Sequence, residues 1–269
     1  MSSKLVFGSL TLKSIYNGGY AVNEKKLNKI VNVAIILFFI YPFALVWGLL
    51  FLLGSLRVRG RCKFLITGYE HLLAIREQTI LVSNHPSVID PFIVAALLIP
   101  KFLAHPIRFC PRIVADKKIF YDKWFMFWLR PIMIPVDRGD RRSEATSLIT
   151  IIRAIKQGGV VIIFPEAGRT FKGEKFLFSK TGKMVRILSG GIGLIATRTN
   201  ATILPIWLDG TDHVPPNSRK GLLHRFSWLR LFSKCATIRI GKSFSIPTTC
   251  TREKAIQQVA NAILALADE

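Results

Sequence analysis

Residues Thr79 to Asp90, TILVSNHPSVID, decide the fold, because an apolar run, a polar turn and the start of a helix follow one another there. The run TILVS predicts a buried β-strand. Prolines are favoured in the first turn of a helix, since backbone N–H groups there have no intrahelical partner. Pro86 and Pro91 therefore predict a helix that begins within residues 86–90 and continues through FIVAALLI. The stretch indicates a strand that ends and turns into a helix.

The same stretch places a histidine and a carboxylate where they can pair. His85 comes just after the strand, and Asp90 stands five residues further on, across roughly one helical turn. A carboxylate bonded to one imidazole nitrogen fixes the tautomer and leaves the other nitrogen free to accept a proton from a hydroxyl. The pair is a candidate general base. The alternative is a helix-capping aspartate beside an incidental histidine.

Short apolar strands alternate with helices through most of the chain. The expected strands are 64–68, 79–83, 112–115, 131–136, 159–164, 201–208 and 236–241. The expected helices are 88–99, 120–130, 143–157, 181–198 and 252–267. This alternation predicts an α/β fold with a mostly parallel sheet flanked by helices. In such sheets the functional groups collect in loops beyond the carboxyl ends of the strands.

Two further loops at strand ends carry charged residues that suit a phosphate. PVDRGDRRS (135–143) contains Arg138, and FPEAGRT (164–170) places Glu166 and Arg169 three residues apart. An arginine presents a planar fork of donors that matches phosphate oxygens, so a substrate with a hydroxyl and a phosphate would suit these loops. The alternatives are a solvated basic surface for Arg138 and an internal ion pair between Glu166 and Arg169 that braces the loop.

The composition combines an apolar excess with a strong positive charge. Hydrophobic residues make up 50% of the 269 residues, the mean hydropathy is +0.36 and the formal net charge is +22. Together these properties indicate an anionic membrane surface rather than a nucleic acid, because nucleic-acid binders do not need the apolar excess. The four cysteines include no C-x-x-C pair, which indicates reduced thiols with neither a zinc site nor a disulfide framework.

Residues 30–56 contain no charged residue and are flanked by basic residues on both sides. As one helix this segment would extend about 40 Å, enough to cross a hydrocarbon core of about 30 Å. If the positive flanks stay cytoplasmic, a helical hairpin bent near Pro42 suits both ends better than a single span. We therefore expect membrane embedding without a full crossing, anchored through 30–56 at the cytoplasmic face. The basic and aromatic segment 219–242 is also expected at lipid headgroups, or else as the polar face of a core element.

The ordered set NHPSVID, PVDR, FPEAGRT and ILPIWLDG resembles the four motifs of the glycerophospholipid acyltransferases, the family of 1-acylglycerol-3-phosphate acyltransferases. The likeness covers about residues 65–246 and implies an acyltransferase domain over 61–269 behind an anchoring segment over 1–60. It implies transfer of a fatty acyl group from acyl-CoA or acyl-carrier protein to the free hydroxyl of 1-acylglycerol-3-phosphate, giving phosphatidate. The implied partners are membrane lipids and the acyl donor, with acyl-carrier protein as one option; no metal, other cofactor or nucleic acid is expected.

The resemblance also implies roles for single residues, with His85 as the base and Asp90 as its orienting partner. The implied substrate-binding residues are Asn84, Lys117, Arg138, Glu166, Gly168 and Arg169. The two residues between Glu166 and Arg169 are alanine and glycine where the family has glycine and threonine, so the backbone of this loop is expected to differ.

Two alternatives to this function stay open. The stretch LDGTDHVPPNSRKGLLHRF (208–226) is similar to enzymes that reacylate lysophosphatidylethanolamine, which makes that lipid the alternative acceptor. A basic membrane-binding scaffold without activity is the other alternative. The chain contains no nucleophile-elbow G-x-S-x-G, so an enzyme of this kind is expected to transfer the acyl group directly.

Overall fold

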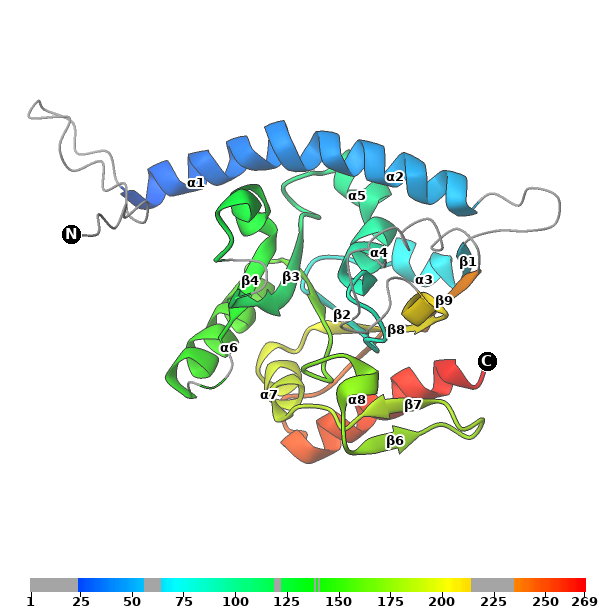
Figure 1. The fold of residues 1–269 in the computed structure, drawn as a ribbon. Helices are drawn as coiled ribbons and strands as arrows, with labels where there is room; N and C mark the ends of the chain where they lie inside the picture. The colour runs from blue at the N-terminus through cyan, green and yellow to red at the C-terminus, as the bar shows by residue number, and fades with distance from the viewer. Residues whose placement is uncertain (1–23, 56–63, 119–121, 138, 140, 214–234) are drawn as a thin grey trace, which may run out of the picture.

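A mixed β-sheet with helices on both faces forms the centre of the molecule (Figure 1). The structure is a computed structural model that describes residues 24–55, 64–118, 122–137, 139, 141–213 and 235–269. The strands of this sheet are β1 (Phe64–Thr67), β2 (Thr79–Ser83), β3 (Pro111–Asp116), β4 (Met133–Val136), β5 (Val160–Ile163), β8 (Thr202–Asp209), β9 (Ala236–Ile240) and β10 (Phe244–Ser245). Their order is β1-β9-β8-β2-β5-β3-β4, with β10 paired to β8.

Most neighbouring strands of this sheet run parallel, and its antiparallel pairs are β8 with β9 and β8 with β10. The predicted α/β fold with a mostly parallel sheet is therefore confirmed. Strand β2 is completely buried between β5 and β8. Because parallel strands end at the same edge, the loops after β2, β5, β3 and β4 all leave the sheet on one side.

Two layers of helices cover the sheet. They are α3 (Tyr69–Leu73), α4 (Asp90–Leu97), α5 (Ile99–Ala104), η3 (Trp124–Ile132), α6 (Arg141–Lys156), α7 (Gly190–Thr199) and α8 (Arg252–Ala267). The elements α3, α4, α5 and η3 contribute to one apolar core, and α6, α7 and α8 contribute to the other. Side chains alternate along a strand, so Leu81 of β2 enters the first core while Ile80 and Val82 enter the second.

Two predicted helices differ from the structure. Within 181–198 the chain forms the end of a small hairpin, β6 (Phe176–Phe178) and β7 (Met184–Arg186), before α7 begins at Gly190. The hairpin turn uses Gly182 at a φ of +80°, a conformation that a helix interior does not contain. The predicted helix 120–130 is the 3₁₀ element η3, which holds Pro131 near its end. Tighter 3₁₀ turns are common in short connecting elements of this kind.

The N-terminal apolar segment is one long helix, and the bend expected near Pro42 is wrong. Helix α1 (Glu24–Ile35) continues through η1 (Ile36–Ile40) into α2 (Tyr41–Ser55). The element η1 is a π turn, in which the Tyr41 N–H donates to the Ile36 carbonyl five residues back. This wide turn lies directly before Pro42 and accommodates the proline without reversing the chain. Of the two expected forms of this segment, a helical hairpin or a single helix, the structure contains the single helix.

The long helix lies across the domain rather than projecting from it (Figure 1). Both α1 and η1 contact η3, and α2 contacts α4, α5 and β1. Residues 27–55 have a mean hydropathy of 2.5 in their most apolar window, and only 22% of that window is buried. The basic residues after Ser55, the predicted boundary at residue 60 and the segment 214–234 lie outside the described residues.

Candidate active site

The loops that carry the predicted motifs meet at the carboxyl edge of β2 and β5. These strands pair in parallel with Val82 opposite Ile163, so His85 and Glu166 follow strand ends that lie side by side. The Thr170 N–H donates to the carbonyl of His85 at 2.8 Å and ties the two loops together. Helix α4 begins at Asp90, inside the predicted interval.

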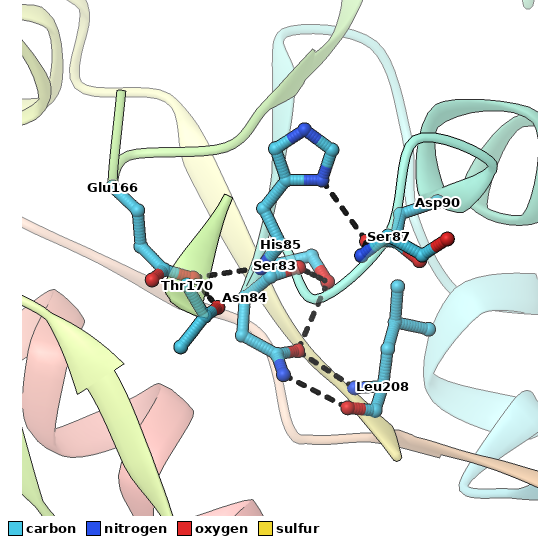
Figure 2. A network of polar contacts seen from close by, with 8 residues as sticks. All are labelled: Ser83, Asn84, His85, Ser87, Asp90, Glu166, Thr170 and Leu208. Carbon is cyan, nitrogen blue, oxygen red and sulfur yellow. Dashed lines mark hydrogen bonds and ion pairs between the residues drawn. The ribbon is translucent and has the colours of Figure 1, made fainter. Parts of the chain in front are cut away.

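His85 and Asp90 form a hydrogen-bonded pair (Figure 2). The distance between His85 Nδ1 and Asp90 Oδ2 is 2.9 Å, and the Ser87 N–H donates to the same oxygen at 2.6 Å. The Asp90 carboxylate is fully buried, so it accepts from Nδ1 in a fixed direction. Within the described residues Nε2 makes no hydrogen bond, and the ring lines a cavity. This geometry leaves Nε2 as a proton acceptor.

Burial dominates the electrostatics of Asp90. It raises the pKa of this carboxyl, while the hydrogen bond and charge of His85, the Ser87 N–H and the Thr211 hydroxyl act in the opposite direction. The Thr211 hydroxyl lies close enough to lower the pKa of Asp90, but Asp90 Oδ1 and Thr211 Oγ1 are both buried and form no hydrogen bond of good geometry with a described residue. Thr211 was missed by sequence reasoning. Its only sequence signal is its position directly after the LDG of the fourth motif.

Glu166 is a buried brace between three segments of chain. Its Oε1 accepts from the His85 N–H at 2.7 Å and from the Thr170 hydroxyl at 2.9 Å, and its Oε2 accepts from the Arg186 N–H at 2.8 Å. Burial raises the pKa of Glu166, and these three donors, led by the Arg186 N–H, oppose the rise. Figure 2 shows Glu166 and Asp90 on opposite sides of His85. The histidine is thus held by its backbone on one side and by its ring on the other.

Asn84 joins the loop after β2 to strand β8. Its Nδ2 donates to the Leu208 carbonyl at 2.8 Å, and its Oδ1 accepts from the Leu208 N–H at 2.7 Å (Figure 2). The side chain pairs with β8 as a neighbouring strand would and is 3% exposed. These two bonds use both polar atoms of the amide and position the loop after β2, while the substrate contact of Asn84 stays a prediction.

A cavity of about 390 Å³ opens beside His85. The charged side chains in its wall are Asp116, Arg169 and Lys172. The other wall residues are mostly apolar and come from β3, β4, β5, α6 and α7; they include Val114, Val136, Leu148, Ile151, Ile163, Ile192 and Ile195. A proton acceptor therefore stands near two cations and an apolar surface, an arrangement that suits an amphiphile with an anionic group. Lys172 is a further residue that no motif identified.

The remaining predicted residues fall at three places. Gly168 and Arg169 line the cavity. Lys117 lies outside its wall, with Nζ 3.9 Å from Asp137 Oδ2. Arg138 lies outside the described residues. Ala167 adopts a φ of +52°, the left-handed region that a glycine occupies without strain, so the loop keeps a glycine-like backbone at this position.

The described part of the chain contains no group of three or more His, Cys, Asp or Glu side chains able to hold a metal ion. The charged side chains nearest His85 are instead used in hydrogen bonds to the protein itself, as Asp90 and Glu166 show.

Comparisons with known proteins identify relatives over most of this region. The family model described as Acyltransferase matches residues 63–209. The protein 1-acyl-sn-glycerol-3-phosphate acyltransferase LPAT1, chloroplastic, of Arabidopsis thaliana is 27% identical over 172 residues, which are 64% of this chain and 43% of that protein. The corresponding protein BAT2 of Brassica napus is 28% identical over 160 residues, 59% of this chain and 41% of that protein. The chain thus spans less than half the length of these relatives.

Among solved structures, the crystal structure of the 1-acyl-sn-glycerophosphate (LPA) acyltransferase PlsC from Thermotoga maritima is similar with a TM-score of 0.49. The sequence identity is 19%, and the match covers 90% of this chain and 98% of that chain.

Proposed function

This chain belongs to the acyltransferase family, and from that premise we propose that it transfers a fatty acyl group from a thioester to the free hydroxyl of 1-acylglycerol-3-phosphate, giving phosphatidate. The observation that carries the proposal is the His85–Asp90 pair, whose Nε2 lines a cavity with two cations and an apolar wall. Relatives named as 1-acyl-sn-glycerol-3-phosphate acyltransferases support this choice of acceptor.

His85 acts in the proposed reaction as general base and then as general acid. Nε2 takes the proton of the acceptor hydroxyl while that oxygen attacks the thioester carbonyl. The tetrahedral intermediate collapses, the C–S bond breaks, and the departing sulfur receives the proton from the imidazolium. Asp90 stabilises the imidazolium and keeps the ring in the required tautomer. A positioned base of this kind contributes about 10²–10⁴-fold in rate.

The acceptor's phosphate is assigned to the cations of the cavity wall. Arg169 and Lys172 line the same cavity as His85, and an arginine fork matches two phosphate oxygens. Gly168 directly precedes Arg169 in the chain, and its backbone lines the same cavity. Glu166 and Asn84 support the site through its backbone. Arg138 is assigned to the phosphate by the family motif alone.

The apolar wall is assigned to an alkyl chain of one substrate. Side chains from α6 and α7, such as Leu148, Ile151 and Ile192, face this space and would exclude water from the hydrocarbon. The acyl donor is either acyl-CoA or acyl-carrier protein, and it serves as co-substrate without a further cofactor. The reaction as written needs no other group.

The proposed location is the cytoplasmic face of a membrane, with the long helix lying in the membrane surface. Exposed apolar residues recur along its outer side at Phe38, Leu45, Leu49 and Leu52, and Phe38 is 77% exposed. Their spacings of seven, four and three residues place them on one helical face. Both ends of the helix contact the same domain, so a perpendicular crossing would draw that domain into the hydrocarbon. An in-plane helix is supported by both observations.

The experiment that tests the proposed function is an acceptor panel. The purified chain is reconstituted in phospholipid vesicles and offered 1-acylglycerol-3-phosphate or lysophosphatidylethanolamine, each with acyl-CoA and with acyl-carrier protein. We expect the highest kcat/KM with 1-acylglycerol-3-phosphate. Faster reacylation of lysophosphatidylethanolamine would replace the proposed acceptor, and vesicle binding without transfer to either lipid would favour the scaffold.

A further inference from the structure

A second cavity, of about 890 Å³, lies between the long helix and the amino ends of β3 and β4. Lys29, Val33 and Ile36 line it from the helix, and Arg112 of β3 and Met133 of β4 line it from the sheet. Nothing in the proposed reaction uses this space. It adjoins the helix that we assign to the membrane surface, so its contents are expected to come from the membrane.

The charge of this cavity is strongly positive. Its wall contains four cations, Lys29, Arg108, Arg112 and Arg130, and one carboxylate, Glu77. Glu77 Oε1 lies 2.6 Å from Arg108 Nε, so one cation is already neutralised. In the part of the chain that the structure describes, Lys29 and Arg112 have no carboxylate within 4.0 Å. Four positive charges against one negative charge leave a net +3 facing a single space.

Apolar surface borders these cations. Val33, Ile36, Met133 and Ile134 belong to the cavity wall, and Ile107 at its edge is 65% exposed. On the helix next to the cavity, Ile30 is also exposed. A free anion would leave this apolar surface in water, whereas a phospholipid would bring a phosphate to the cations and acyl chains to the apolar rim.

The cavity is distinct from the one that contains His85. Strand β3 separates them, with Arg112 near its amino end in the second cavity and Asp116 at its carboxyl end in the first. Four residues of extended chain span roughly 13 Å. A phosphate held by Arg112 is therefore too far from Nε2 to belong to the reacting acceptor.

We propose that this second cavity binds the phosphate headgroup of an anionic glycerophospholipid of the surrounding membrane. The bound lipid fixes the amino-terminal end of the helix and the edge of the sheet at the membrane surface. The proposal rests on the proposed membrane attachment and is independent of the proposed chemistry, because binding is measured without turnover.

The test is flotation of the full chain with vesicles of phosphatidylcholine, with and without phosphatidylglycerol, at constant ionic strength. The variants are Arg112→Ala and Arg112→Lys, and the matched control is Arg198→Ala. Arg198 is equally charged and exposed but lies on α7, outside the wall of this cavity. Since Arg112 has an exposed side chain, its replacement leaves both cores intact.

We expect Arg112→Ala to weaken partitioning into the anionic vesicles by about fivefold, with Arg198→Ala changing it by less than about twofold. The partitioning of Arg112→Lys into the anionic vesicles should lie between that of Arg112→Ala and that of wild type. A lysine ammonium keeps the positive charge but lacks the planar pair of donors of a guanidinium. Partitioning into vesicles of pure phosphatidylcholine should be the same for all variants. If the wild-type chain does not partition into these vesicles, the proposed membrane attachment is wrong.

Three outcomes would contradict the proposed phospholipid site. Equal losses for Arg112→Ala and Arg198→Ala would indicate diffuse attraction to the membrane. Displacement of the protein from anionic vesicles by inorganic phosphate, but not by chloride at the same ionic strength, would indicate a site for free phosphate. Unchanged partitioning together with a raised KM for acyl-CoA in Arg112→Ala would indicate that the cations hold the donor's phosphates.

Discussion

The two cavities at opposite ends of β3 hold their polar groups in different ways. Around His85 the carboxylates of Asp90 and Glu166 are buried and bonded to main-chain N–H groups. Around Arg112 the cations are exposed side chains that come from α1, β3, η3 and the loop before β3. Proton transfer needs reacting atoms placed to within about 1 Å, and only the first arrangement supplies that precision. Attraction of a headgroup needs charge at the right place, which flexible cations provide.

The largest expected effect comes from replacing the orienting carboxylate. Asp90→Asn keeps the shape of the buried side chain but removes the acceptor that fixes His85 Nδ1–H, so the imidazole adopts the wrong tautomer for proton abstraction. We expect kcat to fall by about 10²–10⁴-fold with unchanged vesicle binding. Steady-state transfer assays measure the first quantity and flotation the second.

The control for Asp90→Asn is Asp122→Asn, because Asp122 is an exposed carboxylate outside the cavity wall and should leave kcat unchanged. A loss of less than about fivefold in Asp90→Asn would show that precise orientation of His85 is not what distinguishes this cavity.

The next largest effect is on stability. Glu166→Ala leaves three donors without an acceptor, the part-buried N–H groups of His85 and Arg186 and the buried hydroxyl of Thr170. An unsatisfied buried donor costs about 1–3 kcal/mol, and water can reach the two part-buried N–H groups. We therefore expect a total loss of about 2–5 kcal/mol and a clear drop in Tm. Glu166→Gln should lose less, and Glu174→Ala, at an exposed glutamate, should match wild type.

Thermal unfolding of the Glu166 variants separates a brace from a substrate ligand. A brace predicts lower Tm and lower activity together. A wild-type Tm with a strongly raised KM for the acceptor would instead assign the carboxylate to the substrate, as the family motif implies.

The smallest expected effect concerns the backbone of the same loop. Ala167 is exposed and adopts a φ of +52°, so Ala167→Gly relieves the clash of its Cβ. We expect a gain of about 1 kcal/mol in the free energy of unfolding, measured as a rise of about 2–4 °C in Tm. A lower Tm would mean that the entropy of glycine outweighs this strain and that the loop is held by its hydrogen bonds alone.

Local patterns were sufficient for the central part of the fold. The apolar run 79–83 and the prolines after it predicted β2, the turn and the start of α4, because these depend on neighbours in sequence. The spacing of His85 and Asp90 likewise predicted their hydrogen bond. The order of the strands and the antiparallel placement of β9 depend on pairings between distant segments, which no local pattern specifies.

The partners of the polar side chains were not predictable for the same reason. Asn84 pairs with Leu208, 124 residues away, and Glu166 bonds to His85 and Arg186, two other segments that only the folded chain brings to it. Thr211 reaches Asp90 in the same way. The bend expected at Pro42 failed because the rule for prolines in helices does not include the π turn that absorbs the proline.

In the proposed reaction His85 removes the acceptor's proton, and the turnover of vesicle-bound His85→Ala tests this step. Wild type and variant are first shown by flotation to be equally membrane-bound, and transfer to 1-acylglycerol-3-phosphate is then measured with saturating donor. We predict turnover reduced by about 10²–10⁴-fold with normal binding to the membrane. Turnover within about threefold of wild type would show that His85 is not the base.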